Sequence, residues 1–245
     1  MSSYVYGVTR ADNDWPPGIV GLEDAAVRRV THERLSALVS DVEGEIIGRR
    51  REVLRHADVV GHALQHGDVL PLQFGMLLDD DSAVVSELME PRQEVLLDLL
   101  SAVDGRVEVR LRGYYDEERI VAEIVAQQPG LRRGAGSFED RIRLGEHVAA
   151  GIASRRAQDE AMIVERLRPW ADDVVLDEPT SELMALNSTF LLPREGLERF
   201  DAVVAELGDD LGPRMQLKYV GPFPPVSFVD LQLEGGASWD YSASS

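Results

Sequence analysis

The chain has 245 residues, 44% of them hydrophobic, which is enough to bury a substantial core in one large domain or two small ones. Its 44 Asp and Glu residues outnumber its 25 Lys and Arg residues, which gives a formal net charge of −19. Because nucleic-acid binding depends largely on cations that neutralise phosphates, this balance argues against a nucleic-acid partner.

The first part of the chain alternates short strands with one helix. Tyr4–Thr9 mixes aromatic and β-branched residues and predicts an opening strand. Val27–Arg34 and Leu35–Val42 place polar and apolar residues at near-alternate positions and predict two more strands. A helix that Gly67 should end follows, with apolar residues on one face at Val53, Ala57, Val60 and Leu64.

The next elements complete a first α+β unit. Val69–Phe74 predicts a buried strand, in which Pro71 requires an edge or a bulge because proline cannot donate to a ladder. Ser82–Val103 has a helical pattern that Pro91 should kink or restart, with one side formed by Val84, Leu88, Val95 and Leu99. Arg106–Arg112 alternates charged and apolar residues, which predicts a strand with one wet face.

The second half begins with Asp116, which can cap a short helix through Gln128, and a Gly- and Pro-containing loop, residues 129–136, follows. Phe138–Leu167 is the longest helical pattern, and its predicted packing stripe is Phe138, Ile142, Ala149, Ala153, Ala157, Ala161 and Val164. The small alanines would allow close helix packing. The remaining patterns predict strands at 174–176, 183–192, 215–220 and 226–231, and a helix at 195–207.

This order of elements predicts an α+β fold with two domains, residues 1–113 and 114–233, each a mainly antiparallel sheet covered by helices. Both domains have ferredoxin-like character, although no sequence repeat demonstrates a duplication. Residues 234–245 are rich in Gly, Ser and Ala and predict a flexible tail. In that tail Trp239 is either an ordinary tail residue or an aromatic anchor for a partner surface.

No catalytic constellation emerges. The chain has no cysteine, which excludes disulfides, thiolate metal sites and cysteine nucleophiles. His62 and His66 are spaced for one metal ion on a helix, but they lie on the predicted solvent side and have no obvious third ligand. Gly134 and Gly136 lack the third glycine and the preceding strand of a dinucleotide site. We therefore expect no enzyme activity, no cofactor and no metal.

The sequence also predicts a cytoplasmic location. No basic segment followed by an apolar stretch resembles a signal peptide, and no run approaches the length of a membrane span, so we expect no membrane partner. The one basic run, Arg49–Arg51, opens a predicted helix and is followed by Glu52, which is typical of a solvated helix terminus more than of a docking patch.

Two apolar segments remain without a catalytic explanation. Val69–Gly75 is a strand interrupted by proline, and Tyr219–Phe228 is an extended segment that three prolines preorganise. The second segment is either a rigid loop between strands or an exposed docking edge. As an edge it offers candidate contacts with a protein partner at Pro222, Phe223, Pro224, Pro225 and Phe228, with Trp239 in the tail beyond it.

The same segments carry a resemblance to a known family, the gas vesicle proteins F and L. The chain resembles this family at Tyr4–Gly7, Leu70–Gly75, Arg141–Glu146, Leu186–Asn187 with Phe190–Leu191, Tyr219–Pro225 and Ser227–Phe228. Departures are Gln73, where the family tends to have Arg, Val220, where it tends to have Thr, and Val226, where Tyr is frequent. A polar role assigned to those three positions in the family would not carry over to this chain.

The resemblance implies a two-domain α+β protein that is a minor gas vesicle component, binds the hydrophobic shell protein, prevents its aggregation and assists vesicle nucleation. Other minor gas vesicle proteins would be further partners. An alternative is a ferredoxin-like small-molecule-binding module or enzyme with a pocket between sheet and helices. A third interpretation makes the protein a permanent lining of the finished shell in place of a transient chaperone.

Overall fold

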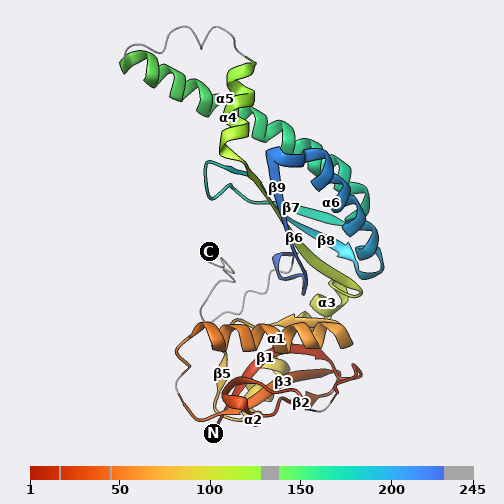
Figure 1. The fold of residues 1–245 in the computed structure, drawn as a ribbon. Helices are drawn as coiled ribbons and strands as arrows, with labels where there is room; N and C mark the ends of the chain where they lie inside the picture. The colour runs from red at the N-terminus through yellow and green to blue at the C-terminus, as the bar shows by residue number, and fades with distance from the viewer. Residues whose placement is uncertain (17, 45, 128–137, 229–245) are drawn as a thin grey trace. The chain divides into compact units, whose positions relative to one another are not determined.

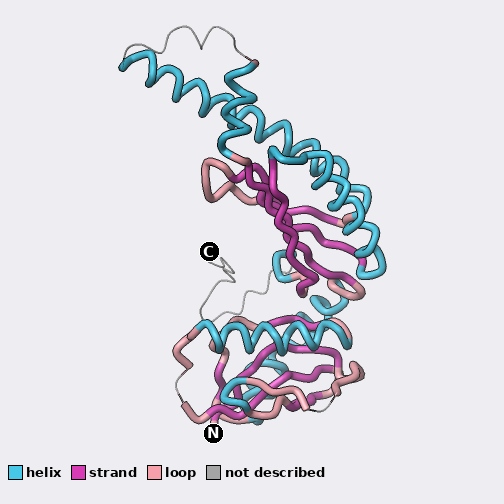
Figure 2. Tube along the Cα trace, viewed as in Figure 1, coloured by secondary structure: helices cyan, strands magenta, loops and turns pink. Residues whose placement is uncertain are grey.

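The computed structural model describes residues 1–16, 18–44, 46–127 and 138–228 (Figure 1). The chain divides into two compact units, Met1–Val107 and Glu108–Pro222, with the described residues from Phe223 onward belonging to the first. Each unit contains an antiparallel sheet with helices packed on it, as Figure 2 shows. The predicted α+β class is therefore confirmed, whereas the predicted tail lies outside the described residues.

The first sheet has the order β2-β3-β1-β4. The short strand β5 also pairs with β1, at Ser3 and Tyr4, whereas β4 pairs with β1 at Gly7–Thr9. Its strands are β1 (Ser2–Arg10), β2 (Arg28–His32), β3 (Leu35–Val42), β4 (Val69–Pro71) and β5 (Leu77–Leu78). All the pairings are antiparallel. The strand expected to reach Phe74 ends at Pro71, and Pro71 lies on an edge strand as its missing N–H requires.

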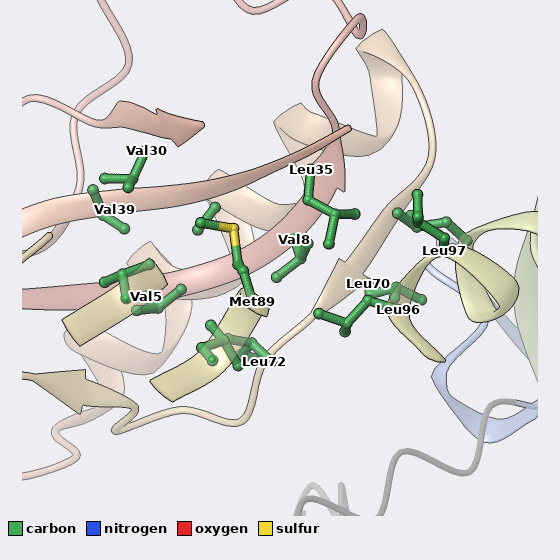
Figure 3. Close-up of a cluster of buried hydrophobic side chains, with 14 of the residues drawn as sticks. Val5, Val8, Val30, Leu35, Val39, Leu70, Leu72, Met89, Leu96 and Leu97 are labelled. Atoms are coloured by element: carbon green, nitrogen blue, oxygen red, sulfur yellow. The ribbon is translucent and has the colours of Figure 1, made fainter. Parts of the chain in front are cut away.

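Helices cover both faces of the first sheet, which is why β1 is buried along almost its whole length. A register shift between Val5 and Gly7 makes Tyr6 the extra residue of a bulge, so that Val5 and Val8 share one face. On that face Leu35, Leu70, Met89 and Leu96 join them in one apolar core cluster (Figure 3).

The opposite face of the first sheet packs on α1 (Arg50–His66). The predicted helix ends before Gly67 as expected, but its buried stripe is rotated from the expected one. Ala57 is exposed, and the inward residues are His56, Val59, Val60, Ala63 and Leu64. A contact with β1 explains the rotation, because the Tyr4 hydroxyl and Nδ1 of His56 form a hydrogen bond of 2.8 Å that holds His56 on the inward side.

The segment expected as one kinked helix consists of four pieces. These are α2 (Asp81–Ala83), a π-helical turn (Val84–Met89), a 3-10 turn (Glu90–Arg92) and α3 (Gln93–Ala102). The π turn inserts one extra residue, which shifts the buried side by one position. Val95 is therefore 57% exposed where burial was expected, whereas Leu96, Leu97 and Leu100 are buried.

The second sheet has the order β7-β8-β6-β9. Its strands are β6 (Arg106–Tyr115), β7 (Asp173–Leu176), β8 (Met184–Pro193) and β9 (Met215–Phe223). In both sheets the spatial order is thus the second strand, the third, the first and then the fourth. The two units share a strand order without a recognisable sequence repeat.

The helices of the second unit are α4 (Glu117–Ala126), α5 (Phe138–Leu167) and α6 (Leu197–Leu211). Asp116 caps α4 as predicted, because its carboxylate accepts the Arg119 N–H at 3.0 Å.

Short 3-10 turns lie at Leu22–Asp24, Arg168–Trp170, Arg194–Gly196, Gly212–Arg214 and Val226–Phe228. The last of these lies where the sequence pattern predicted the start of a strand, so that expectation is wrong for Val226–Phe228.

Of two expectations for the second unit, one holds in part and one is wrong. On the face of β6 expected to be wet, Arg106, Arg110 and Arg112 are partly exposed, whereas Glu108 is fully buried and its carboxylate pairs with Arg110 at 2.9 Å. In α5 the predicted packing stripe faces outward: Phe138 is 70% exposed, and Ala149, Ala153, Ala157 and Ala161 are exposed. The buried residues of this helix are Asp159, Ile163 and Leu167.

Candidate partner-binding edge

The strand β9 forms one edge of the second sheet. Its inner side pairs with β6, and within the described residues no strand pairs with its outer side. An edge strand presents a row of free backbone N–H and C=O groups that another extended chain can pair with. This strand leads directly into the predicted docking segment, so it is the natural starting point for a binding site.

Alternate side chains of β9 hold it against α6. Met215 is buried, and the Tyr219 ring packs 6.2 Å from the Phe200 ring, which lies 5.2 Å from the Phe190 ring. The Tyr219 hydroxyl donates to the Asp201 carboxylate on α6. Burial, followed by this hydrogen bond, raises the pKa of Tyr219 above its ordinary value. The strand is therefore fixed from one face, while no strand of the described residues pairs with its outer edge.

A buried charge cluster fixes the start of β9. Asp159 of α5 accepts hydrogen bonds from the Tyr115 hydroxyl at 2.7 Å and from the Arg214 guanidinium at 2.8 Å. Arg155 adds a second cation, 3.3 Å from Asp159 and 3.1 Å from Glu123 of α4. Desolvation and the bond to Asp159 raise the pKa of Tyr115. This cluster ties β6, α4, α5 and the residue before β9 together.

Sequence reasoning missed the Asp159 cluster. Its signal was present, because Asp159, Ile163 and Leu167 follow one another at four-residue spacing and mark the buried side of the helix. The alanines of this helix are more numerous and suggested a different buried face. Alanine is also common at exposed helix positions, because it has the highest helix propensity.

The outer end of β9 is exposed. Val220 is 53% exposed, and Gly221 and Pro222, which are joined by a cis peptide bond, are exposed as well. Gly221 has φ +147, and a Cβ there would lie 3.0 Å from the Glu108 carbonyl oxygen. Glycine is therefore required where this end of the strand approaches β6.

The predicted contact residues differ in accessibility. Phe223 and Phe228 are half-buried, whereas Pro224 and Pro225 are buried. The backbone there is folded tightly, with the Val226 N–H donating to the Pro224 carbonyl at 2.8 Å and the Phe228 N–H to the Pro225 carbonyl at 3.2 Å. Trp239 lies outside the described residues. Of the described candidates, Pro222 and the two phenylalanines thus retain accessible surface.

The histidine pair on α1, expected on the solvent side, is partly exposed, and ring packing covers part of it. The rings of His62 and His66 lie 4.5 Å apart, and Trp15 packs edge-on at 5.9 Å from His62, which leaves His62 Nε2 buried. Burial and the neighbouring His66 lower the pKa of His62. Among the described residues no group of three or more His, Asp or Glu side chains could hold a metal ion.

A cavity of about 300 Å³ lies between α4 and α5, and its lining includes Glu123, His147, Ser154 and Arg155. Another cavity of the same volume lies in the first unit, beside Leu22, Ile47, Arg51 and Arg55. In the first cavity Arg155 pairs with Glu123, so these two charges satisfy each other. Within the part of the chain that the structure describes, no helix is long and apolar enough to cross a membrane.

The sequence of this chain is similar to those of one known protein family. The family described as "Gas vesicle synthesis protein GvpL/GvpF" matches residues 2–230. Gas vesicle protein F of Streptomyces sp. (strain CB03234) is 35% identical over 241 residues, covering 94% of this chain and all of that protein. Gas vesicle protein F of Nostoc sp. (strain PCC 7120 / SAG 25.82 / UTEX 2576) is 25% identical, with 94% and 100% coverage.

Two solved structures share the fold. The crystal structure of GvpF from Anabaena sp. PCC7120 superposes with a TM-score of 0.80 at 24% identity, over 93% of this chain and 97% of that one. The crystal structure of GvpF from Microcystis aeruginosa gives a TM-score of 0.77 at 22% identity, over 93% and 98%. Their α+β architecture is the one described above.

Proposed function

We propose that this chain, which belongs to the gas vesicle synthesis protein GvpL/GvpF family, binds the hydrophobic gas vesicle shell protein, prevents its aggregation and assists vesicle nucleation and assembly. It acts in the cytoplasm and at the growing vesicle, by binding, and catalyses no reaction. Other minor gas vesicle proteins join the complex.

The observation that carries this proposal is the outer edge of β9, with which no strand in the described part of the chain pairs, and which continues into the exposed Val220, Gly221 and Pro222. A shell subunit made faster than it assembles exposes apolar surface and unpaired strand edges, which self-associate. An edge strand on a second protein can occupy such a strand by main-chain pairing. The rigid support of β9 by α6 and by the Asp159 cluster keeps that edge preformed.

Charge supports the same role. The formal net charge of −19 gives a complex of this chain with a hydrophobic subunit enough repulsion to stay dispersed. The residues after the edge add apolar contacts. Phe223 and Phe228 are the side chains proposed to touch the shell subunit, and the buried Pro224 and Pro225 fix the backbone between them.

Co-expression with the shell protein tests the proposal. We expect the shell protein to become soluble and to co-purify with this chain at moderate salt, and the variant Phe223→Ala with Phe228→Ala to co-purify less of it. A shell protein that stays aggregated and unbound would contradict the proposed function. Unchanged binding by the double variant would remove the Phe223–Phe228 segment from the site and leave the rest of the proposal intact.

The transient role is distinguishable from a permanent lining. A chaperone that leaves after assembly is absent from washed intact vesicles, whereas a lining protein is recovered from them at a fixed ratio to the shell protein. We expect the transient role, and quantitative mass spectrometry of washed vesicles measures the ratio.

The competing function is a small-molecule-binding module, which the cavity between α4 and α5 favours. A ligand that binds only the native state raises the melting temperature. A metabolite panel that shifts the melting temperature of the wild type, but not of Ser154→Trp, would support this alternative.

A further inference from the structure

The two faces of the second sheet carry different side chains. Successive residues of a strand point to opposite faces, so Tyr115 and Tyr219, which bond to α5 and α6, lie on one face, and their neighbours Tyr114 and Lys218 lie on the other. The contact between Lys218 and Tyr114 confirms the second placement, since the Lys218 Nζ lies 4.8 Å from the centre of the Tyr114 ring. Both α5 and α6 pack on the first of these faces (Figure 1), so no described helix of this unit covers the face of Tyr114 and Lys218.

This face carries the three cations Arg110, Arg112 and Lys218, together with the carboxylate of Glu108, which is fully buried. Arg110 and Arg112 precede Tyr114 by four and two residues, so all three side chains lie on the same face of β6. Arg110 pairs with the buried Glu108, but Arg112 and Lys218 make no ion pair with any residue that the structure describes. In a chain with 44 Asp and Glu against 25 Lys and Arg, two cations beside one another without a carboxylate are a local reversal of the overall charge.

The cations adjoin the open edge. Lys218 lies within β9, and Val220 follows it on the same face with 53% of its surface exposed. An extended segment that pairs with the outer edge of β9 would place every second side chain on this face, at the level of Lys218 and Val220. Opposite charges in cross-strand positions attract, whereas like charges oppose the pairing.

We infer that the segment bound at the edge of β9 is an acidic strand of the shell protein, with carboxylates at alternating positions that face Lys218 and Arg112. This inference rests on the proposed function and adds the chemistry of the partner. Main-chain pairing supplies the attachment, and the two cations select register and orientation. The high negative charge elsewhere on the chain directs an acidic strand to this one face by repelling it from others.

Charge reversal at Lys218 tests the inference. The wild type and Lys218→Glu are co-expressed with the shell protein, and the dissociation constant of the purified complex is measured at low and high salt. We expect Lys218→Glu to weaken binding about tenfold or more at low salt, equivalent to about 1.4 kcal/mol, and the difference to shrink at high salt because exposed charges are screened. Lys218→Arg keeps the charge and should retain wild-type affinity.

The matched control is Arg50→Glu. Arg50 is exposed in the first turn of α1, so this variant changes net charge by the same amount on the first unit. Equal binding by Lys218→Glu, Arg50→Glu and the wild type would overturn the inference and leave the proposed function standing. A wild type that does not bind the shell protein at all would overturn both.

Discussion

The phenol oxygen of Tyr4 and Nδ1 of His56 lie 2.8 Å apart in the interior of the first unit. The Tyr4 oxygen also accepts the Gly75 N–H at 3.1 Å, and the other side of the His56 ring bonds to the Leu72 backbone. His56 is almost fully buried, and desolvation lowers its pKa from 6.5 to about 4. This relationship links β1, α1 and the turn after β4 through one neutral imidazole.

The first prediction concerns acid stability. Because the unfolded chain binds a proton at His56 below about pH 6.5 and the folded chain only below about 4, the free energy of unfolding falls as pH drops through this window. The loss should reach about 3 kcal/mol. Urea unfolding between these pH values measures it. His56→Gln should remove most of the pH dependence, whereas His32→Gln should keep it; an unchanged slope in His56→Gln would refute the assignment.

A second prediction concerns the Asp159 cluster. Asp159→Asn keeps the size of the side chain but removes one of the two carboxylates that Arg155 and Arg214 share, the other being Glu123, which should cost about 1–3 kcal/mol of stability. The matched control is Glu139→Gln, which breaks an exposed pair with Arg143 on the same helix and should cost under about 0.5 kcal/mol. Equal effects in the two variants, measured by denaturant unfolding, would show that the cluster adds nothing.

Two glycines of α5 give a third prediction, with opposite signs. A Cβ at Gly151 would lie 2.5 Å from Ile124 Cγ2 of α4, so Gly151→Ala should destabilise the protein by about 1–3 kcal/mol. At Gly145 no atom lies within 4 Å, and Gly145→Ala should stabilise the helix by about 1 kcal/mol. Melting temperatures of the two variants should move in opposite directions, and a shift in the same direction would contradict the packing of α4 on α5.

The fourth prediction tests the register after the π turn. Leu96 is fully buried, so Leu96→Ala should cost about 2–5 kcal/mol. Val95 is 57% exposed, so Val95→Ala should change stability by less than about 0.5 kcal/mol. A larger loss for Val95→Ala than for Leu96→Ala in denaturant unfolding would restore the register predicted from the sequence pattern.

The contrast between Leu96 and Val95 shows where sequence reasoning ended. Periodicity located this helical segment and Pro91 marked its break, but a regular 3.6-residue repeat cannot anticipate the extra residue of a π turn. In α5 the same periodicity predicted both ends, Phe138 and Leu167, and the wrong face. Most strands were located from their β-branched and alternating residues, but β5 was not predicted, and the strand expected from Val226 begins with a 3-10 turn.

The candidate site was less predictable than the fold. The prolines and aromatics of 219–228 directed attention to this segment, yet burial of Pro224 and Pro225 depends on tertiary packing that no local pattern records. The open edge of β9 was not predictable either, because it follows from strand order. Asp159 and Arg214 lie 55 residues apart, so only the fold brings them together.

The most direct test of edge binding uses two exposed valines. Val220→Glu places a negative charge at the outer edge of β9, where a charged side chain disfavours strand addition, and Val95→Glu makes the same change at a similarly exposed position on α3. Each variant is co-expressed with the shell protein, and the shell protein that co-purifies is measured. We predict that Val220→Glu loses most of the bound shell protein while Val95→Glu retains the wild-type amount. Equal amounts with both variants would contradict binding at the edge of β9.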